Sequence, residues 1–239
     1  MACRGRANKP DANAPTGFKA ALPPVMKEDA SAMMLEPEGT LGLWSWRRAV
    51  ADLYQAVRAM PDPERAWSMW RTGRNRLFRG HPASPVRAEA RAEFADLPFY
   101  PYDPDFRFVV DVEEPERPES LTIAAGPDGV VHLRAFARTR GLVPDLGGEL
   151  TLYWLTGYGG GVFLPFRDAT SGQDTFGGGR YLLDSVKGAD LGWNDDGQVI
   201  LDFNFAFSPS CAHDPQWACP LAPSGNTLPV SVTVGEKLG

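Results

Sequence analysis

The spacing of apolar residues changes along this chain, from every third or fourth position to every second. Over residues 43–57 the apolar side chains recur at spacings of three and four, which predicts a helix with one apolar face. Beyond residue 97 apolar and polar residues alternate, as in residues 130–138, and this pattern is typical of β-strands. The change predicts a helical extension over residues 41–96 and an antiparallel β domain over residues 97–239, which together form one folding unit.

Two further helix starts are marked by proline. Asp62-Pro63-Glu64 supplies an N-cap, a proline at the first helical position and an early acidic residue, so a second helix is predicted to end at Gly80. Ser84-Pro85 repeats the signal for a third, shorter helix that ends near Phe94. Each helix has a single apolar stripe, so we expect all three to pack on a sheet.

Short alternating segments, separated by glycine and proline turns, fill the second half of the chain. About eight antiparallel strands are expected there, and the clearest lie at residues 121–125, 130–138, 149–156, 162–166, 181–183, 199–205 and 229–234. A barrel or a sandwich is the expected fold, because both arrangements leave few exposed sheet edges. The fold class is therefore predicted to be mainly β, with the helical extension packed on it.

Composition narrows the functional classes. The 30 acidic and 24 basic residues give a formal charge of −6, which disfavours binding to nucleic acid. Three cysteines are too few for a disulfide scaffold, and no apolar run approaches the roughly 18 residues of a membrane helix. We therefore expect a cytoplasmic protein that binds neither nucleic acid nor membrane. Residues 1–40, rich in proline and small polar residues, are predicted to be a disordered tail.

The residues that could carry chemistry gather between Phe163 and Pro220. The first group is Arg167-Asp168-Ala169-Thr170-Ser171-Gly172, directly after a predicted strand. Its short polar side chains can bond to nearby backbone N–H groups, and its glycine permits a positive φ, so a structural corner is one interpretation. The other is that this corner directs Arg167 or Asp168 into a pocket, with Thr170 beside them.

Three glycines precede Arg180 and Tyr181. A glycine run lets backbone N–H groups approach an anion closely, but no Gly-Lys-Ser/Thr ending or following helix supports a phosphate-binding loop. A tight turn or a bulge is the simpler interpretation. Arg180 remains a candidate to pair with a carboxylate, from Asp168 or from a ligand.

The segment Leu201-Asp202-Phe203-Asn204-Phe205 alternates strictly, so Asp202 and Asn204 are predicted to share one face of a strand. Inside a barrel covered by helices, that face would place an acid and an amide in the interior. A buried carboxylate needs partners and often has a shifted pKa that suits acid–base chemistry. A surface face or a structural ion pair is the alternative.

Cys211, His213 and Cys219 have the ligand types that zinc prefers. The usual Cys-x2–4-Cys spacing is absent and only three ligands lie here, so a metal site is a minor alternative and no cofactor is predicted. Buried thiols, or a local disulfide that depends on redox conditions, fit the segment better.

Several long motifs resemble the uncharacterised prokaryotic family known as domain of unknown function 1684. They include RLFRGHPASPV, FYPYDPDFRF, FRDATSGQDTFGGGRYL, LDFNFAFSPSCAH and CPLAPSGNTLPVSV, and the resemblance runs from about Leu43 to Lys237. It implies a single domain of unknown biochemical role. Phe176 stands where this family is expected to have Tyr, and His213 where it is expected to have an aromatic residue such as Phe. The family's pattern falls on Arg167, Asp168, Gly172, Gly178, Arg180, Tyr181, Asp202, Asn204, Cys211, Cys219, Asn226 and Glu236, among others.

These patterns lead to a functional hypothesis, a small-molecule-binding β-barrel domain with acid–base catalysis as an option. Asp202, Asp168 and Arg180 are the predicted catalytic residues. The residues predicted to hold an anionic or carboxylate-bearing ligand are Arg167, Tyr181, Asn204, Thr170 and Asn226. The rival hypothesis is a non-catalytic structural or interaction module, in which the same residues form a buried salt-bridge core. A homodimer stays open in both.

Overall fold

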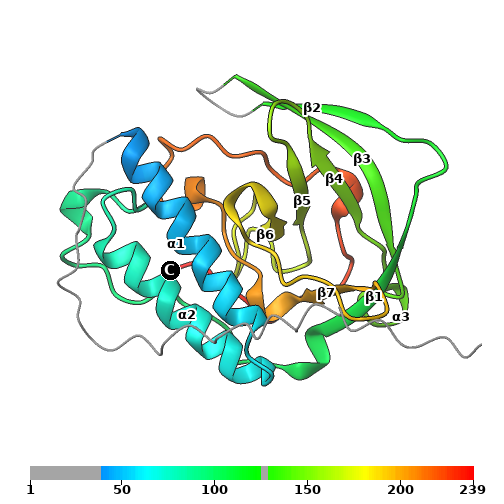
Figure 1. The fold of residues 1–239 in the computed structure, drawn as a ribbon, viewed down its shortest axis with the longest axis horizontal. Coiled ribbons are helices and arrows are strands. Elements are labelled where there is room, and N and C mark those ends of the chain that lie inside the picture. The colour runs from blue at the N-terminus through cyan, green and yellow to red at the C-terminus, as the bar shows by residue number, and fades with distance from the viewer. Residues whose placement is uncertain (1–38, 125–128) are drawn as a thin grey trace, which may run out of the picture. The chain divides into compact units, whose positions relative to one another are not determined.

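The structure is a computed structural model that describes residues 39–124 and 129–239 (Figure 1). The predicted tail over residues 1–40 therefore lies outside the described residues, except at its end, where Thr40 already begins a helix.

Two helices precede the sheet, α1 (Thr40–Arg58) and α2 (Pro63–Gly80). The predicted start of α2 is confirmed, because the Asp62 side chain accepts a hydrogen bond of 3.1 Å from the backbone N–H of Arg65. Both helices lie side by side against the sheet in Figure 1.

The predicted third helix is wrong. Only a single 3₁₀ turn forms there, over Ala88–Ala90. Side chains bind the backbone that a helix would have paired: the Arg91 guanidinium donates to the carbonyls of Pro82 and Val86, each at 2.9 Å. The Ser84 hydroxyl donates to the carbonyl of Phe78 at 2.6 Å. These contacts fix the segment as a series of turns.

Seven antiparallel strands form one sheet that nearly closes into a barrel, as predicted for a mainly β fold. The sheet order is β6-β5-β4-β3-β1-β7, with β2 paired to β3. Beyond β7, Phe207 pairs with Tyr181 of β6 and links the two ends of the sheet. The strands are β1 (Arg107–Glu113), β2 (Ser120–Ala124), β3 (Val130–Arg140), β4 (Thr151–Leu155), β5 (Gly161–Phe166), β6 (Arg180–Asp184) and β7 (Val199–Asp202), with a short helix, α3 (Val143–Leu146), between β3 and β4.

Three details differ from the sequence-based expectation. The strand β1 was missed, although Phe108, Val110 and Val112 alternate with other residues, because it directly follows a proline-rich segment and proline is rare in strands. The strand predicted at 199–205 ends at Asp202, and a 3₁₀ turn follows over Phe203–Phe205. The segment predicted as a strand at 229–234 joins no ladder.

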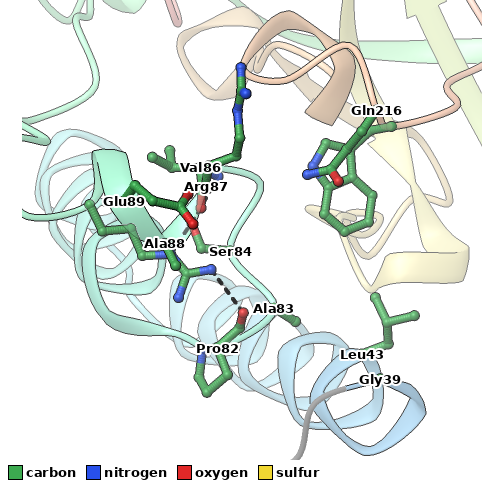
Figure 2. A pocket seen from close by; sticks show the side chains of 12 residues that line it. Gly39, Leu43, Pro82, Ala83, Ser84, Val86, Arg87, Ala88, Glu89 and Gln216 are labelled. Carbon is green, nitrogen blue, oxygen red and sulfur yellow. Dashed lines mark hydrogen bonds between the residues drawn. The ribbon is translucent and has the colours of Figure 1, made fainter.

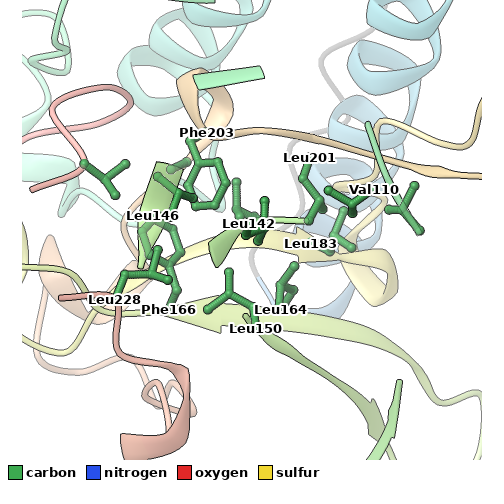
Figure 3. Close-up of a cluster of buried hydrophobic side chains, with 14 of the residues drawn as sticks. Val110, Leu142, Leu146, Leu150, Leu164, Phe166, Leu183, Leu201, Phe203 and Leu228 are labelled. Carbon is green, nitrogen blue, oxygen red and sulfur yellow. The ribbon is translucent and has the colours of Figure 1, made fainter. Parts of the chain in front are cut away.

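Apolar side chains pack on both faces of the sheet. One cluster fills the barrel and includes Leu164, Phe166, Leu201 and Phe203 (Figure 3). A second cluster lies between the sheet and the two helices, where Trp67 and Trp70 of α2 pack with residues of β3, β4, β5 and β6. All five residues of β6 are buried as a result, so a charged side chain on this strand must find its partners within the protein.

Candidate functional site

Arg180, the first residue of β6, is the most deeply buried cation described, with a relative exposure of 1%. Its guanidinium donates to three backbone carbonyls. They belong to Val234, to Val232 at 2.9 Å and to Glu236 at 3.4 Å. These carbonyls belong to alternate residues of the irregular C-terminal segment. One planar side chain therefore satisfies acceptors that a neighbouring strand would otherwise have bound.

Asp168 balances the charge of Arg180. Its Oδ1 lies 3.5 Å from Nη2 of Arg180, and its Oδ2 accepts a 2.7 Å hydrogen bond from the backbone N–H of Val232. Thr170 and Ser171 donate their hydroxyls to the same carboxylate. The segment after β5 is thus a structural corner, in which Asp168 binds Thr170, Ser171, Val232 and Arg180.

The glycine run before Arg180 is a tight turn. Gly179 adopts a φ of 93°, and a Cβ atom there would lie 2.5 Å from the carbonyl oxygen of Phe166. Only glycine fits this position, and the turn brings Arg180 to the C-terminal segment.

Asp202 and Asn204 are both fully buried, and they lie on a turn and not, as predicted, on one strand face. Asp202 Oδ1 accepts from the backbone N–H of Asn204 at 3.0 Å, which ends β7 in a 3₁₀ turn. Its Oδ2 lies 3.2 Å from Nη1 of Arg107. Burial raises the pKa of Asp202, and the hydrogen bonds of Asn204 and the charge of Arg107 oppose this rise.

Two buried asparagines each bind both the N–H and the carbonyl of one distant residue, as a neighbouring strand does in a sheet. The amide of Asn204 accepts from the N–H of Asp103 at 2.9 Å and donates to its carbonyl at 2.8 Å. The amide of Asn226 forms the same pair of bonds with Thr151 of β4, each at 2.9 Å, and donates to the carbonyl of Pro165. Both side chains extend hydrogen bonding to backbone groups outside the regular ladders.

Tyr181 and Arg167 belong to different surroundings. The buried Tyr181 hydroxyl donates to the carbonyl of Pro220 at 2.6 Å, and its ring packs edge-on against Phe163. Arg167 is half-buried and pairs through its backbone with Asn226 and Leu228, while its Nε has no hydrogen-bond partner among the described residues. The residues predicted to form one site are therefore distributed over several networks.

The sequence interpretation missed a further ionic cluster, formed by Arg74, Glu236 and His213. Glu236 is fully buried, with Oε2 at 2.7 Å from Nη2 of Arg74 and Oε1 at 3.1 Å from Nε2 of His213. Burial raises the pKa of Glu236, but Arg74 and His213 outweigh this effect and hold the pKa below its ordinary value. No local pattern marks the cluster, because its members lie on α2, after β7 and near the end of the chain.

The side chains of the zinc alternative are not arranged as a ligand set. His213 faces Glu236, while Cys211 and Cys219 lie together as free thiols. Among the residues that the structure describes, no group of three or more His, Cys, Asp or Glu side chains is placed to hold a metal ion.

A pocket of about 470 Å³ lies away from the predicted residues, between the turns after α2 and the segment that carries Gln216 and Trp217 (Figure 2). The Trp217 ring N–H donates to the carbonyl of Pro85 at 3.2 Å, and Arg87 lies 2.8 Å from Asp214. These two contacts join the walls of the pocket. Asp168, Arg180, Asp202 and Asn204 do not line it.

A family model described as "Protein of unknown function (DUF1684)" matches residues 92–237, more than half of the chain. The chain belongs to this family. The matched span covers all seven strands of the DUF1684 domain and begins after α1 and α2, which the sequence resemblance had included.

Other comparisons add no activity. The solution NMR structure of an uncharacterized protein of Haloarcula marismortui is 35% identical, with 70% of this chain and 89% of that chain covered and a TM-score of 0.48. No curated protein matches the chain. Within the described residues, no helix has the length and apolar character needed to cross a membrane.

The Glu236 cluster predicts a specific pH dependence of stability. The pKa of Glu236 is lower in the folded state than its ordinary value of 4.5. Ionised Glu236 therefore stabilises the folded protein at pH values above 4.5, and this stabilisation is lost as the pH falls through the lowered pKa. We expect Glu236→Gln to cost about 3 kcal/mol at pH 7, since it leaves Arg74 without its anion. Between about pH 5 and pH 3, the wild type should lose stability more steeply than the variant.

Urea unfolding at a series of pH values checks this expectation. The matched control is Glu113→Gln, because Glu113 forms a 2.7 Å pair with Arg140 on the surface. It should change stability by less than about 1 kcal/mol. Parallel pH profiles of the wild type and Glu236→Gln would contradict the assignment.

Proposed function

We propose that this domain is a non-catalytic structural module, in which the family's polar motif residues form a buried core that fixes loops and the C-terminal segment. The proposal rests on one observation: the side chains of Asp168, Arg180, Asp202, Asn204 and Asn226 are occupied by the protein's own backbone and by each other. Both oxygens of Asp202 have partners within the protein, Asn204 on Oδ1 and Arg107 on Oδ2.

This interpretation replaces acid–base catalysis by Asp202 as the preferred function. A general base needs a substrate proton within hydrogen-bonding reach, and Asp202 has a relative exposure of 0%. Its partner Arg107 is part of the same network and neutralises its charge. A cytoplasmic setting belongs to the proposal, and the small number of cysteines supports it.

Stability measurements distinguish a structural residue from a catalytic one. Catalytic residues are often poorly optimised for stability, so their replacement leaves stability unchanged or increases it. Asn204→Ala removes the paired contacts with Asp103 and a contact with Asp202, and should lower the free energy of unfolding by about 2–4 kcal/mol.

The control is Asn194→Ala. The Asn194 amide also forms several hydrogen bonds, but only with Asp196 and Gln198 in its own turn. It should cost about 1 kcal/mol or less in the same urea titration. An Asn204→Ala variant as stable as the wild type would contradict the structural role.

A second candidate function is binding of a small molecule in the pocket shown in Figure 2. Its volume of about 470 Å³ supports this candidate, since ligand pockets commonly measure about 300–1,000 Å³. Trp217 supplies an aromatic wall, and Glu89 and Gln216 supply polar groups. The contacts of Trp217 with Pro85 and of Arg87 with Asp214 hold the walls of this pocket in place, so both functions are compatible.

Native mass spectrometry of the purified full chain tests this candidate. A bound small molecule should appear as an added mass on the wild type and be lost from Trp217→Ala, because truncation removes the aromatic wall. Trp44→Ala, which removes an exposed tryptophan outside the pocket, should retain it. An adduct that persists in Trp217→Ala would place the ligand elsewhere, and the absence of any adduct counts against this candidate.

A further inference from the structure

Two free thiols meet in the segment that follows β7. The backbone N–H of Cys211 donates to Sγ of Cys219 at 3.4 Å, so the two free cysteines lie next to each other. Cys219 has a relative exposure of 8%, while Cys211 is half-buried. Neither thiol belongs to the ionic networks described above, so their proximity is unexplained by the structural function.

The surroundings favour a thiolate on Cys219. The hydrogen bond from Cys211 lowers the pKa of Cys219 and outweighs the opposing effect of burial, and the backbone N–H groups of Cys211 and Ser210 and the charge of Lys187 act in the same direction. The pKa of Cys211 is raised, mainly by its bond to Cys219. Nearby, Lys187 lies 2.9 Å from Asp184, and the Tyr181 phenol keeps its proton because burial raises its pKa.

Two hydrogen bonds to other parts of the fold hold the residues on either side of Cys219 in place. The Tyr181 hydroxyl anchors Pro220, the residue next to Cys219, at 2.6 Å. Trp217 is anchored to Pro85 through its ring N–H at 3.2 Å. Contacts outside the loop thus hold the chain on both sides of Cys219, and the backbone of Cys211 binds its sulfur directly, which keeps the two residues close as a nucleophilic and a resolving thiol need to be.

We propose that Cys211 and Cys219 form a redox-active dithiol that is oxidised to an intramolecular disulfide by a small hydroperoxide. Cys219 is the attacking thiolate and Cys211 the resolving thiol. The low exposure of Cys219 favours hydrogen peroxide over a bulky disulfide as the oxidant, since the attacking sulfur must contact it.

The reaction has two steps. The Cys219 thiolate attacks one oxygen of hydrogen peroxide; an S–O bond forms, the O–O bond breaks, and the departing hydroxide takes up a proton to become water. The Cys211 sulfur then attacks the Cys219 sulfur; the S–S bond forms, the S–O bond breaks, and the oxygen leaves as water with the Cys211 proton. The two sulfurs lose two electrons, and the peroxide is reduced to two molecules of water.

The full chain with Cys3→Ser tests this proposal, because it retains only the two relevant cysteines. After treatment of the reduced protein with one equivalent of hydrogen peroxide, both thiols should disappear together in a titration under denaturing conditions. No Lys or Arg lies between residues 188 and 236, so one tryptic peptide, 188–237, carries both cysteines. Its mass should fall by two hydrogen atoms while the protein keeps its oligomeric state.

Two variants on the same background assign the roles. With Cys211→Ala, oxidation should stop at a sulfenic acid on Cys219, which dimedone traps. With Cys219→Ala, the remaining thiol should react at least about tenfold more slowly at pH 7, because a partly buried thiol without an acidifying neighbour is largely protonated.

Three results would overturn the proposal: thiols that survive the treatment, a disulfide that joins two chains, or accumulation of sulfinic acid while Cys211 is present. Equal reaction rates for Cys219→Ala and its parent would reverse the assigned roles. The parent protein alone decides whether the disulfide forms, so the test holds even if a variant fails to fold.

Discussion

The contact between the Arg180 guanidinium and three carbonyls of the C-terminal segment is the constraint on which the rest of the structure depends. Val232, Val234 and Glu236 are fully buried, although their segment joins none of the ladders of the sheet. Its acceptors cannot be left without donors in the interior, because each would lose the hydrogen bonds it makes with water. Arg180 supplies those donors from β6, and Asp168 both balances its charge and binds the N–H of Val232.

The same physical solution recurs elsewhere in the domain. Asn204 and Asn226 extend hydrogen bonding to Asp103 and Thr151 through side-chain amides, and Glu236 anchors the end of the segment to Arg74. A buried ion pair can often be replaced by apolar residues without loss of stability. Here that exchange is unfavourable, since an apolar side chain at position 180 would leave the backbone carbonyls without partners. The polar motifs thus complete the hydrogen bonding of a sheet that does not extend to the C-terminus.

The sequence predicted those features whose conformation is determined by residues close to each other in the chain. The Asp62-Pro63 cap, the alternation in β3 and the corner after β5 depend on neighbouring residues, and each was predicted. The alternation at Asp202 and Asn204 left a buried face and a surface face open; both side chains are buried, and a hydrogen bond from backbone to side chain turns the strand at that point. The alternation at 229–234 suggested a strand, whereas long-range contacts with Arg180 and Asp168 determine its conformation. The Arg74–Glu236 pair joins residues 162 positions apart, a distance over which residue spacing carries no signal.

The hydrogen bond from Tyr181 of β6 to Pro220 also positions Cys219, so the proposed dithiol depends on the same buried contacts as the fold. The central claim is that buried side chains hold the C-terminal segment as firmly as a ladder would. Amide hydrogen exchange of the native protein, followed by NMR, tests it most directly. The account predicts that the N–H of Val232, which is bound by the Asp168 carboxylate, exchanges as slowly as that of Tyr181 in β6, which is bound by a backbone carbonyl. Exchange as fast as at the fully exposed Tyr158 would contradict it.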